Sequence, residues 1–259
     1  MTIEVDYRFP AGVDPHKQAK IIAVGQTVGT WDARFAHREA ALRSHLAEVV
    51  SVQTKTETGH SLATIRFPKA NVENDISSLL TMIFGKYSMA GAAKIVAVRL
   101  PETYGHSSKL GIRGIRERLG VFDRPLIMAI FKPALGLSAS DHAAILAEVA
   151  HAGLDIIKDD EILGDLDIAP TLQRLQACRQ VIDEVKQKTG RTVLYAVNVT
   201  GTADKLLEKA RLLVREGANA LLLNVLTYGF SVLSALASDP EINVPIFAHP
   251  AFAGAMCAA

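Results

Sequence analysis

The chain has 259 residues, 49% of them hydrophobic and 21% charged, which is typical of a globular protein with a substantial core. Lys plus Arg number 28 against 27 Asp plus Glu, so the net charge favours neither nucleic acid nor an anionic membrane, and a small-molecule partner is expected. Polar residues interrupt the most apolar stretch, 220–237, so no membrane-spanning helix is expected. The first residues lack the basic and apolar runs of a signal peptide, which makes the cytoplasm the expected location.

The first hundred residues alternate between short β-rich and helical segments. Strand patterns cover residues 2–9, 48–55, 61–67 and 94–100, and helix patterns cover residues 16–24 and 75–84. A turn at residues 56–59 joins the second and third strands into a hairpin. The order of these elements predicts a ferredoxin-like α+β domain over residues 1–105, followed by a Gly- and Arg-containing connector at residues 106–124.

Residues 125–259 repeat a unit of one strand and one helix. Strand patterns cover residues 126–131, 154–158, 193–199, 220–224 and 244–248, and helix patterns cover residues 141–152, 170–188, 203–215 and 230–238. This repeat predicts either a (β/α)8 TIM barrel or a doubly wound sheet, and the lack of Gly-x-Gly-x-x-Gly after the first strand favours the barrel. Only about five strands precede residue 259, so we expect an α/β barrel that is incomplete in this chain and a fragment of a longer gene product.

A dense group of charges follows the second strand of this region, where Lys158, Asp159, Asp160 and Glu161 end an apolar run. Buried charges must be paired or bind a metal, so this group indicates a cation site. Because alternate strand residues share a face, Lys158 and Asp160 are expected to point together and Asp159 away from them, while Glu161 can turn inward. Polar side chains also end the other four strands, where barrel enzymes hold their chemistry: Lys132, Asn198, Asn224 and His249.

Four motifs resemble the large chain of ribulose bisphosphate carboxylase/oxygenase (RuBisCO), and more closely its non-carboxylating form IV relatives. They are Gly-Thr-Trp at 29–31, Phe-Lys-Pro-Ala-Leu-Gly-Leu at 131–137, Gly-Leu-Asp-Ile-Ile-Lys-Asp-Asp-Glu at 153–161 and Ala-His-Pro-Ala-Phe at 248–252. The resemblance implies that Lys158 takes up CO2 as a carbamate and joins Asp160 and Glu161 in holding Mg²⁺. A carbamate offers this metal the hard anionic oxygen that a lysine ammonium lacks.

The resemblance also implies the remaining site residues. The metal would stabilise the enediolate formed when a proton α to a carbonyl leaves a phosphorylated keto substrate, and Lys132 or Lys86 would be the base, with a pKa lowered by burial and the nearby cation. The implied substrate contacts are Thr30, Trp31, Asn198 and His249. In a homodimer, the amino-terminal domain that carries Thr30, Trp31 and Lys86 would complete the neighbour's site.

Departures from the carboxylases argue against carbon fixation, because Ala134 and Pro250 stand where those enzymes have a lysine and an arginine. Phe-Gly-Lys at 84–86 and Tyr-Ala-Val-Asn at 195–198 resemble the methionine-salvage enolase branch, whereas residues 133–136 resemble other form IV groups. Three functions follow: an Mg²⁺-dependent enolase or tautomerase, a decarboxylase or transcarboxylase on an oxidised branched-sugar phosphate, or a non-catalytic binding or stress-response relative.

Overall fold

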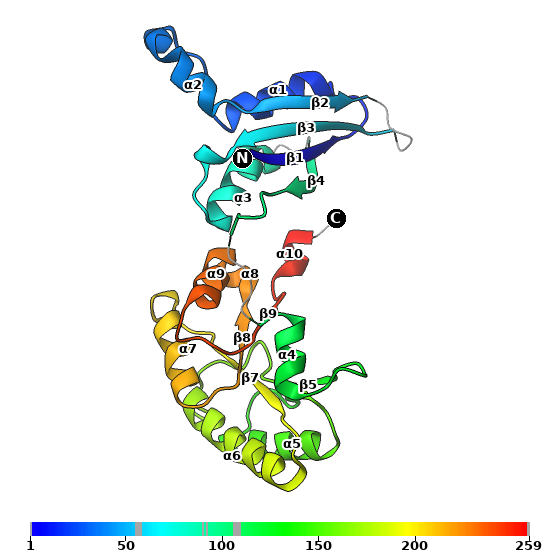
Figure 1. Cartoon of the computed structure of the whole chain (residues 1–259), viewed down its shortest axis with the longest axis vertical. Coiled ribbons are helices and arrows are strands. Elements are labelled where there is room, and N and C mark those ends of the chain that lie inside the picture. The colour runs from blue at the N-terminus through cyan, green and yellow to red at the C-terminus, as the bar shows by residue number, and fades with distance from the viewer. Residues whose placement is uncertain (1, 55–58, 90, 92, 106–109, 258–259) are drawn as a thin grey trace. The chain divides into compact units, whose positions relative to one another are not determined.

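The computed structural model describes residues 2–54, 59–89, 91, 93–105 and 110–257 (Figure 1). The chain divides into two compact units, Met1–Gly105 and His106–Ala259, and each is described by itself. Over the described residues, no helix combines the length and apolarity needed to cross a membrane.

Unit 1 is a four-stranded antiparallel sheet in the order β2-β3-β1-β4, with helices on one face. Its strands are β1 Thr2–Phe9, β2 Glu48–Gln53, β3 Ser61–Pro68 and β4 Lys94–Arg99, and its helices include α1 Pro15–Gly25 and α3 Ile76–Phe84. All six predicted segments are confirmed to within a few residues, and β2 and β3 form the predicted antiparallel pair; most of the predicted turn lies outside the described residues. Strand β1 buries alternate residues, so its apolar side chains face α1 and α3 while its charged ones lie on the opposite face.

The sequence patterns missed the short helical segments of unit 1. These are η1 Ala33–Arg38, α2 Glu39–His45, η2 Lys69–Asn71 and η3 Gly85–Met89. None of them buries a residue, so none has the apolar stripe from which a helix is recognised.

Unit 2 is built on five parallel strands in the order β5-β6-β7-β8-β9, which form a half-barrel. The strands are β5 Met128–Ile130, β6 Ile156–Lys158, β7 Leu194–Asn198, β8 Ala220–Asn224 and β9 Ile246–His249. The helical segments that follow them are α5 Ala139–His151, α6 Thr171–Thr189, η4 Ala203–Lys205, α7 Leu206–Arg215, α8 Val225–Tyr228, α9 Phe230–Ser238 and α10 Ala253–Cys257. The predicted alternation of parallel strands and helices is confirmed.

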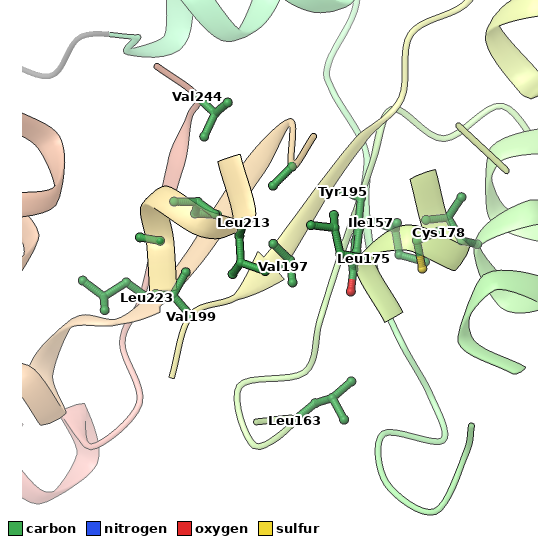
Figure 2. Packing of buried hydrophobic residues seen from close by; sticks show 14 of the residues in the cluster. Ile157, Leu163, Leu175, Cys178, Tyr195, Val197, Val199, Leu213, Leu223 and Val244 are labelled. Carbon is green, nitrogen blue, oxygen red and sulfur yellow. The ribbon is translucent and has the colours of Figure 1, made fainter. Parts of the chain in front are cut away.

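The two faces of the half-barrel carry different layers. One face packs against α5, α6 and α7 through a large apolar cluster, part of which is drawn in Figure 2. The other face packs against α4, Ile112–Leu119, through a second cluster that includes Ile156, Leu194, Ala196 and Leu222. Alternate residues of each strand therefore divide between a helix-facing side and an α4-facing side.

The segment predicted as a connector, 106–124, contains helix α4, which the sequence patterns did not predict. Gly111 and Gly114 favour a loop in sequence terms, yet Gly111 caps the start of this helix and Gly114 lies inside it. Gly120 ends α4 in the left-handed conformation, at φ 69°. Leu119 is buried against the strands, and tertiary packing thus outweighs the low helix propensity of glycine.

Candidate active site at the carboxyl ends of the parallel strands

The charged residues at the end of β6 point to the two opposite sides of the half-barrel. Lys158 follows Ile156 on the α4-facing side, whereas Asp159 follows Ile157 on the side covered by the helices. Lys158, Asp159 and Asp160 are all buried. The separation of Asp159 from its neighbours, predicted from strand alternation, is confirmed by its partners.

Asp159 is a core residue whose carboxylate is fully paired. Arg174 of α6 donates to it from Nη2 at 2.9 Å, Tyr195 donates its hydroxyl at 2.6 Å, and the backbone N–H of Asn198 donates at 2.8 Å. Both Arg174 and Asp159 have fully buried side chains. Burial works against the charged guanidinium, but the adjacent Asp159 outweighs it and raises the pKa of Arg174.

Lys158 and Glu161 meet on the α4-facing side. The Lys158 amine lies 3.6 Å from Oε2 of Glu161 and donates to the carbonyl of Asp159 at 3.0 Å. His249, at the end of β9, places its Nε2 3.5 Å from the same Glu161 oxygen. The structure therefore brings the carboxylate of Glu161 between a lysine and a histidine from strands that are distant in the sequence.

Lys132 pairs with Asp160 across the same strand edge, with 2.5 Å between Nζ and Oδ2. Burial alone would raise the pKa of Asp160, but the hydrogen bond from Lys132, the N–H of Ile162 and the nearby lysine charges outweigh it and hold that pKa low. The bond to Asp160 conversely raises the pKa of Lys132, whose side chain is 68% exposed. Desolvation by itself lowers the pKa of Lys132, but in this structure the hydrogen bond to Asp160 outweighs it.

Two asparagines hold the loop that carries Glu161. The amide nitrogen of Asn198 donates to the carbonyls of Asp160 and Glu161 at 3.3 and 3.1 Å and also to that of Leu163 at 3.1 Å. Asn224 donates to the carbonyl of Glu161 at 2.9 Å. Asn198 is fully buried and its amide oxygen accepts from Thr200, so this geometry gives it a role in holding the loop, which differs from the substrate contact expected from sequence.

The three remaining predicted site residues lie in unit 1 and are all exposed. Thr30 and Trp31 follow α1, and the guanidinium of Arg43 lies 5.5 Å from the Trp31 ring centroid. Lys86 lies in η3, directly after the glycine that ends α3. Gly85 has a φ of 42°, a backbone conformation that L side chains rarely adopt, which favours a glycine before Lys86.

The donor set suits Mg²⁺ only if Lys158 is modified. Asp160 and Glu161 offer the hard oxygens that this ion prefers, but across the part of the chain described no three His, Cys, Asp or Glu side chains gather closely enough to hold a metal ion. A carbamate on Lys158 would supply the third anionic oxygen at the place where its amine now lies near Glu161. The residues present therefore fit a metal held jointly by two carboxylates and a carbamate.

The sequence patterns did not single out Arg174 or the role of Tyr195, although one signal was available for Arg174. Arg174 lies between Thr171 and Cys178 on the buried side of α6, and a charged residue in an apolar stripe indicates a buried partner. Tyr195 belongs to the Tyr-Ala-Val-Asn motif, but nothing in the apolar strand around it indicates that its hydroxyl bonds to a buried carboxylate.

A parallel half-barrel with a lysine and carboxylates at the carboxyl ends of its strands is the arrangement of metal-dependent barrel enzymes. Residues 111–258 match the family model described as ribulose bisphosphate carboxylase large chain, catalytic domain. The chain belongs to this family, as its motifs indicated.

Similar proteins indicate which members of the family this chain resembles. It is 71% identical over 258 residues to the 2,3-diketo-5-methylthiopentyl-1-phosphate enolase of Microcystis aeruginosa, covering all of this chain and 67% of the relative. A solved rubisco-like protein from Alicyclobacillus acidocaldarius is 38% identical with a TM-score of 0.89, over 98% of this chain and 66% of that one. A dimeric archaeal Rubisco from Hyperthermus butylicus is 25% identical with a TM-score of 0.88, over 98% and 61%. The chain thus spans about two thirds of the length of these relatives.

Proposed function

We propose that this chain carries the metal site of an Mg²⁺-dependent enolase that removes a proton α to a carbonyl of a phosphorylated diketo compound. The relative that is 71% identical carries the name of such an enolase. The observation that carries the proposal is the meeting of Lys158 and Glu161, 3.6 Å apart, beside the buried Asp160 at one strand edge.

The charges at this edge support a carbamate on Lys158. Each carboxylate has one cationic partner: Arg174 for Asp159, Lys132 for Asp160 and Lys158 for Glu161. Conversion of the Lys158 ammonium to a carbamate replaces one positive charge with a negative one. The group then carries two surplus negative charges, which a divalent cation balances.

In the proposed reaction, Asp160, Glu161 and a carbamate on Lys158 would hold Mg²⁺, which would supply positive charge to stabilise an enediolate. Asn198 and Asn224 fix the loop that carries Glu161. His249 lies beside Glu161, with its side chain 24% exposed, and is the proposed substrate contact. Lys132 and Lys86 are the two proposed bases. The bond to Asp160 raises the pKa of Lys132 and keeps its amine protonated, so this bond must break before Lys132 can lose its proton and act as a base.

We further propose that unit 1 is the ferredoxin-like domain of a homodimer and brings Thr30, Trp31 and Lys86 to the partner's barrel. The sheet order β2-β3-β1-β4 supports the domain assignment, since the first and third strands are central in that fold. The exposure of all three side chains leaves them available for contact.

The test is Lys158→Ala, with Lys188→Ala as the control because Lys188 lies exposed near the end of α6. Calorimetry measures Mg²⁺ binding with and without bicarbonate, and solvent deuterium uptake measures enolisation of the diketo phosphate. Lys158→Ala is expected to abolish both, while the control retains both. Unchanged Mg²⁺ binding in Lys158→Ala contradicts the metal site, and release of CO2 from a β-keto sugar acid phosphate points instead to the lyase.

A further inference from the structure

Arg174 connects the strand that carries the metal-site residues to the loop that follows it. From α6, its Nε and Nη2 donate to Asp159, its Nη1 donates to the carbonyl of Ala169 at 2.5 Å, and Nη2 also reaches the carbonyl of Gly164 at 3.4 Å. The loop from 160 to 170 begins with Asp160 and Glu161. A single buried guanidinium therefore ties the middle and the far end of this loop to Asp159 at the end of β6.

Asp159 sets the direction of its neighbours through the same bonds. Its carboxylate is held on the helix-facing side by Arg174, Tyr195 and the N–H of Asn198. Since adjacent strand residues point to opposite faces, this anchor directs Lys158 and Asp160 to the other side. The Lys158 amine then donates to the carbonyl of the anchored residue itself, at 3.0 Å.

The apolar surroundings of the Arg174–Asp159 ion pair mean that stability alone does not explain why the pair is there. Figure 2 shows Tyr195 among Ile157, Leu175 and Cys178, all within one apolar cluster. Removing two charges from water in such a place costs about as much as their attraction returns, and apolar residues of similar size often serve stability equally well. What apolar residues cannot supply is a directional link between the strand and the two loop carbonyls.

We propose that Arg174 is a positioning residue: acting through Asp159, it presents Lys158, Asp160 and Glu161 in the geometry that captures bicarbonate-derived CO2 and Mg²⁺. This inference rests on the proposed metal site. It adds a residue that touches neither the metal nor the substrate.

The experiment separates stability from metal capture by removing the whole buried pair. Arg174→Met leaves Asp159 buried and unpaired, so it is expected to lower both thermal stability and Mg²⁺ affinity. The double variant Arg174→Met/Asp159→Leu removes both charges and is expected to recover part of the stability lost in the single variant, since the Tyr195 hydroxyl and the Asn198 N–H still lose their acceptor. Its affinity for Mg²⁺ in bicarbonate is expected to remain at least tenfold below that of the unmodified chain.

A matched control lies at the other end of the same strand. Asp155 directly precedes β6 and is paired with Arg124 at 2.7 Å, with its side chain 3% exposed. Arg124→Met/Asp155→Leu also removes an ion pair beside β6, but one remote from the carboxyl ends of the strands. Its Mg²⁺ affinity is expected to match that of the unmodified chain within twofold, measured by calorimetry at a temperature where every variant is folded.

Two other outcomes overturn the inference in distinguishable ways. If the Arg174→Met/Asp159→Leu variant regains both stability and Mg²⁺ affinity, Arg174 is only a structural residue and the proposed function stands. If the unmodified chain binds no Mg²⁺ in bicarbonate, the metal site itself fails and the inference fails with it. A carbamate signal from ¹³C-bicarbonate on Lys158, seen by NMR in the unmodified chain and lost in the double variant, supports the inference without any turnover assay.

Discussion

The two units use the same kinds of charged residue in opposite ways. In unit 1, Glu4, Asp6, Arg66 and Arg99 lie across one face of the antiparallel sheet, with side chains between 23% and 48% exposed. In unit 2, the pair of Asp159 and Arg174 is fully buried where β6 ends. Exposed ion pairs contribute little because water screens them, whereas a buried charge depends entirely on its partner. The buried ion pair of the parallel half-barrel therefore requires one fixed geometry, whereas the exposed ion pairs of the antiparallel sheet can rearrange in water.

Removal of Arg174 alone is expected to have the largest effect on stability. Arg174→Met leaves the Asp159 carboxylate in the core with only the Tyr195 hydroxyl and a backbone N–H as donors. Breaking a buried ion pair in this way costs about 3–5 kcal/mol. Hydrogen exchange over β6 and β7 measures the loss for unit 2, and a cost below about 1 kcal/mol would contradict the contrast between the units.

Two buried tyrosines, one in each unit, allow a matched comparison, and removal of their hydroxyls is expected to have effects of intermediate size on stability. The Tyr195 hydroxyl donates to the Asp159 carboxylate and the Tyr7 hydroxyl donates to the carbonyl of Ile83, each at 2.6 Å. Tyr195→Phe is expected to cost about 1.5–3 kcal/mol, because its acceptor is charged, and Tyr7→Phe about 0.5–1.5 kcal/mol.

Each tyrosine variant is measured in its own unit by hydrogen exchange, and Trp31 fluorescence reports unit 1 independently, since it is the only tryptophan. Equal costs for the two variants would show that the charge on Asp159 adds nothing to the bond it accepts.

The order of strands and helices was easier to predict from the sequence than the partners of the charged side chains. Periodicity located all nine strands now seen among the described residues, because apolar alternation and continuous apolar runs follow directly from which faces are buried. It also assigned Asp159 and Lys158 to opposite faces. Helix α4 was missed, because two glycines hide a helix whose formation depends on packing against β6, β7 and β8.

The sequence predicted which residues lie at the strand ends of the candidate site, but it did not predict which hydrogen bonds they make. Lys158, Asp160 and Glu161 follow one strand, so their proximity is local. The link from Arg174 to Asp159 and the loop contacts of Asn198 join residues 15 to 38 positions apart, and only the three-dimensional packing decides them. For the same reason, the bonds from the Asn198 amide to the loop could not be predicted from the sequence.

Acid is expected to weaken unit 2 through Asp155. The guanidinium of Arg124 donates to this carboxylate and holds its pKa below the usual value of 3.8. A carboxylate with a lowered folded-state pKa stabilises the fold above its unfolded pKa of about 3.9 and loses that contribution as the pH falls through the folded value. Denaturant unfolding between pH 6 and pH 2 should therefore show a steeper acid decline for the unmodified chain than for Asp155→Asn, and identical slopes would contradict this assignment.

The smallest effect is expected on the exposed face of unit 1. Arg99 bonds to both oxygens of Asp6 at 2.7 Å and to Glu4 at 3.2 Å, yet these groups remain in contact with water. Arg99→Gln should lower the melting temperature of unit 1 only slightly, and high salt should remove the difference, because mobile ions screen exposed pairs. Arg43→Gln, which breaks the more exposed pair with Glu39 and the contact with the Trp31 ring, serves as the comparison and should change the melting temperature less than Arg99→Gln does. If Arg99→Gln instead destabilises unit 1 as much as Arg174→Met destabilises unit 2, and salt does not reduce the effect, then exposure does not explain the difference between the two units.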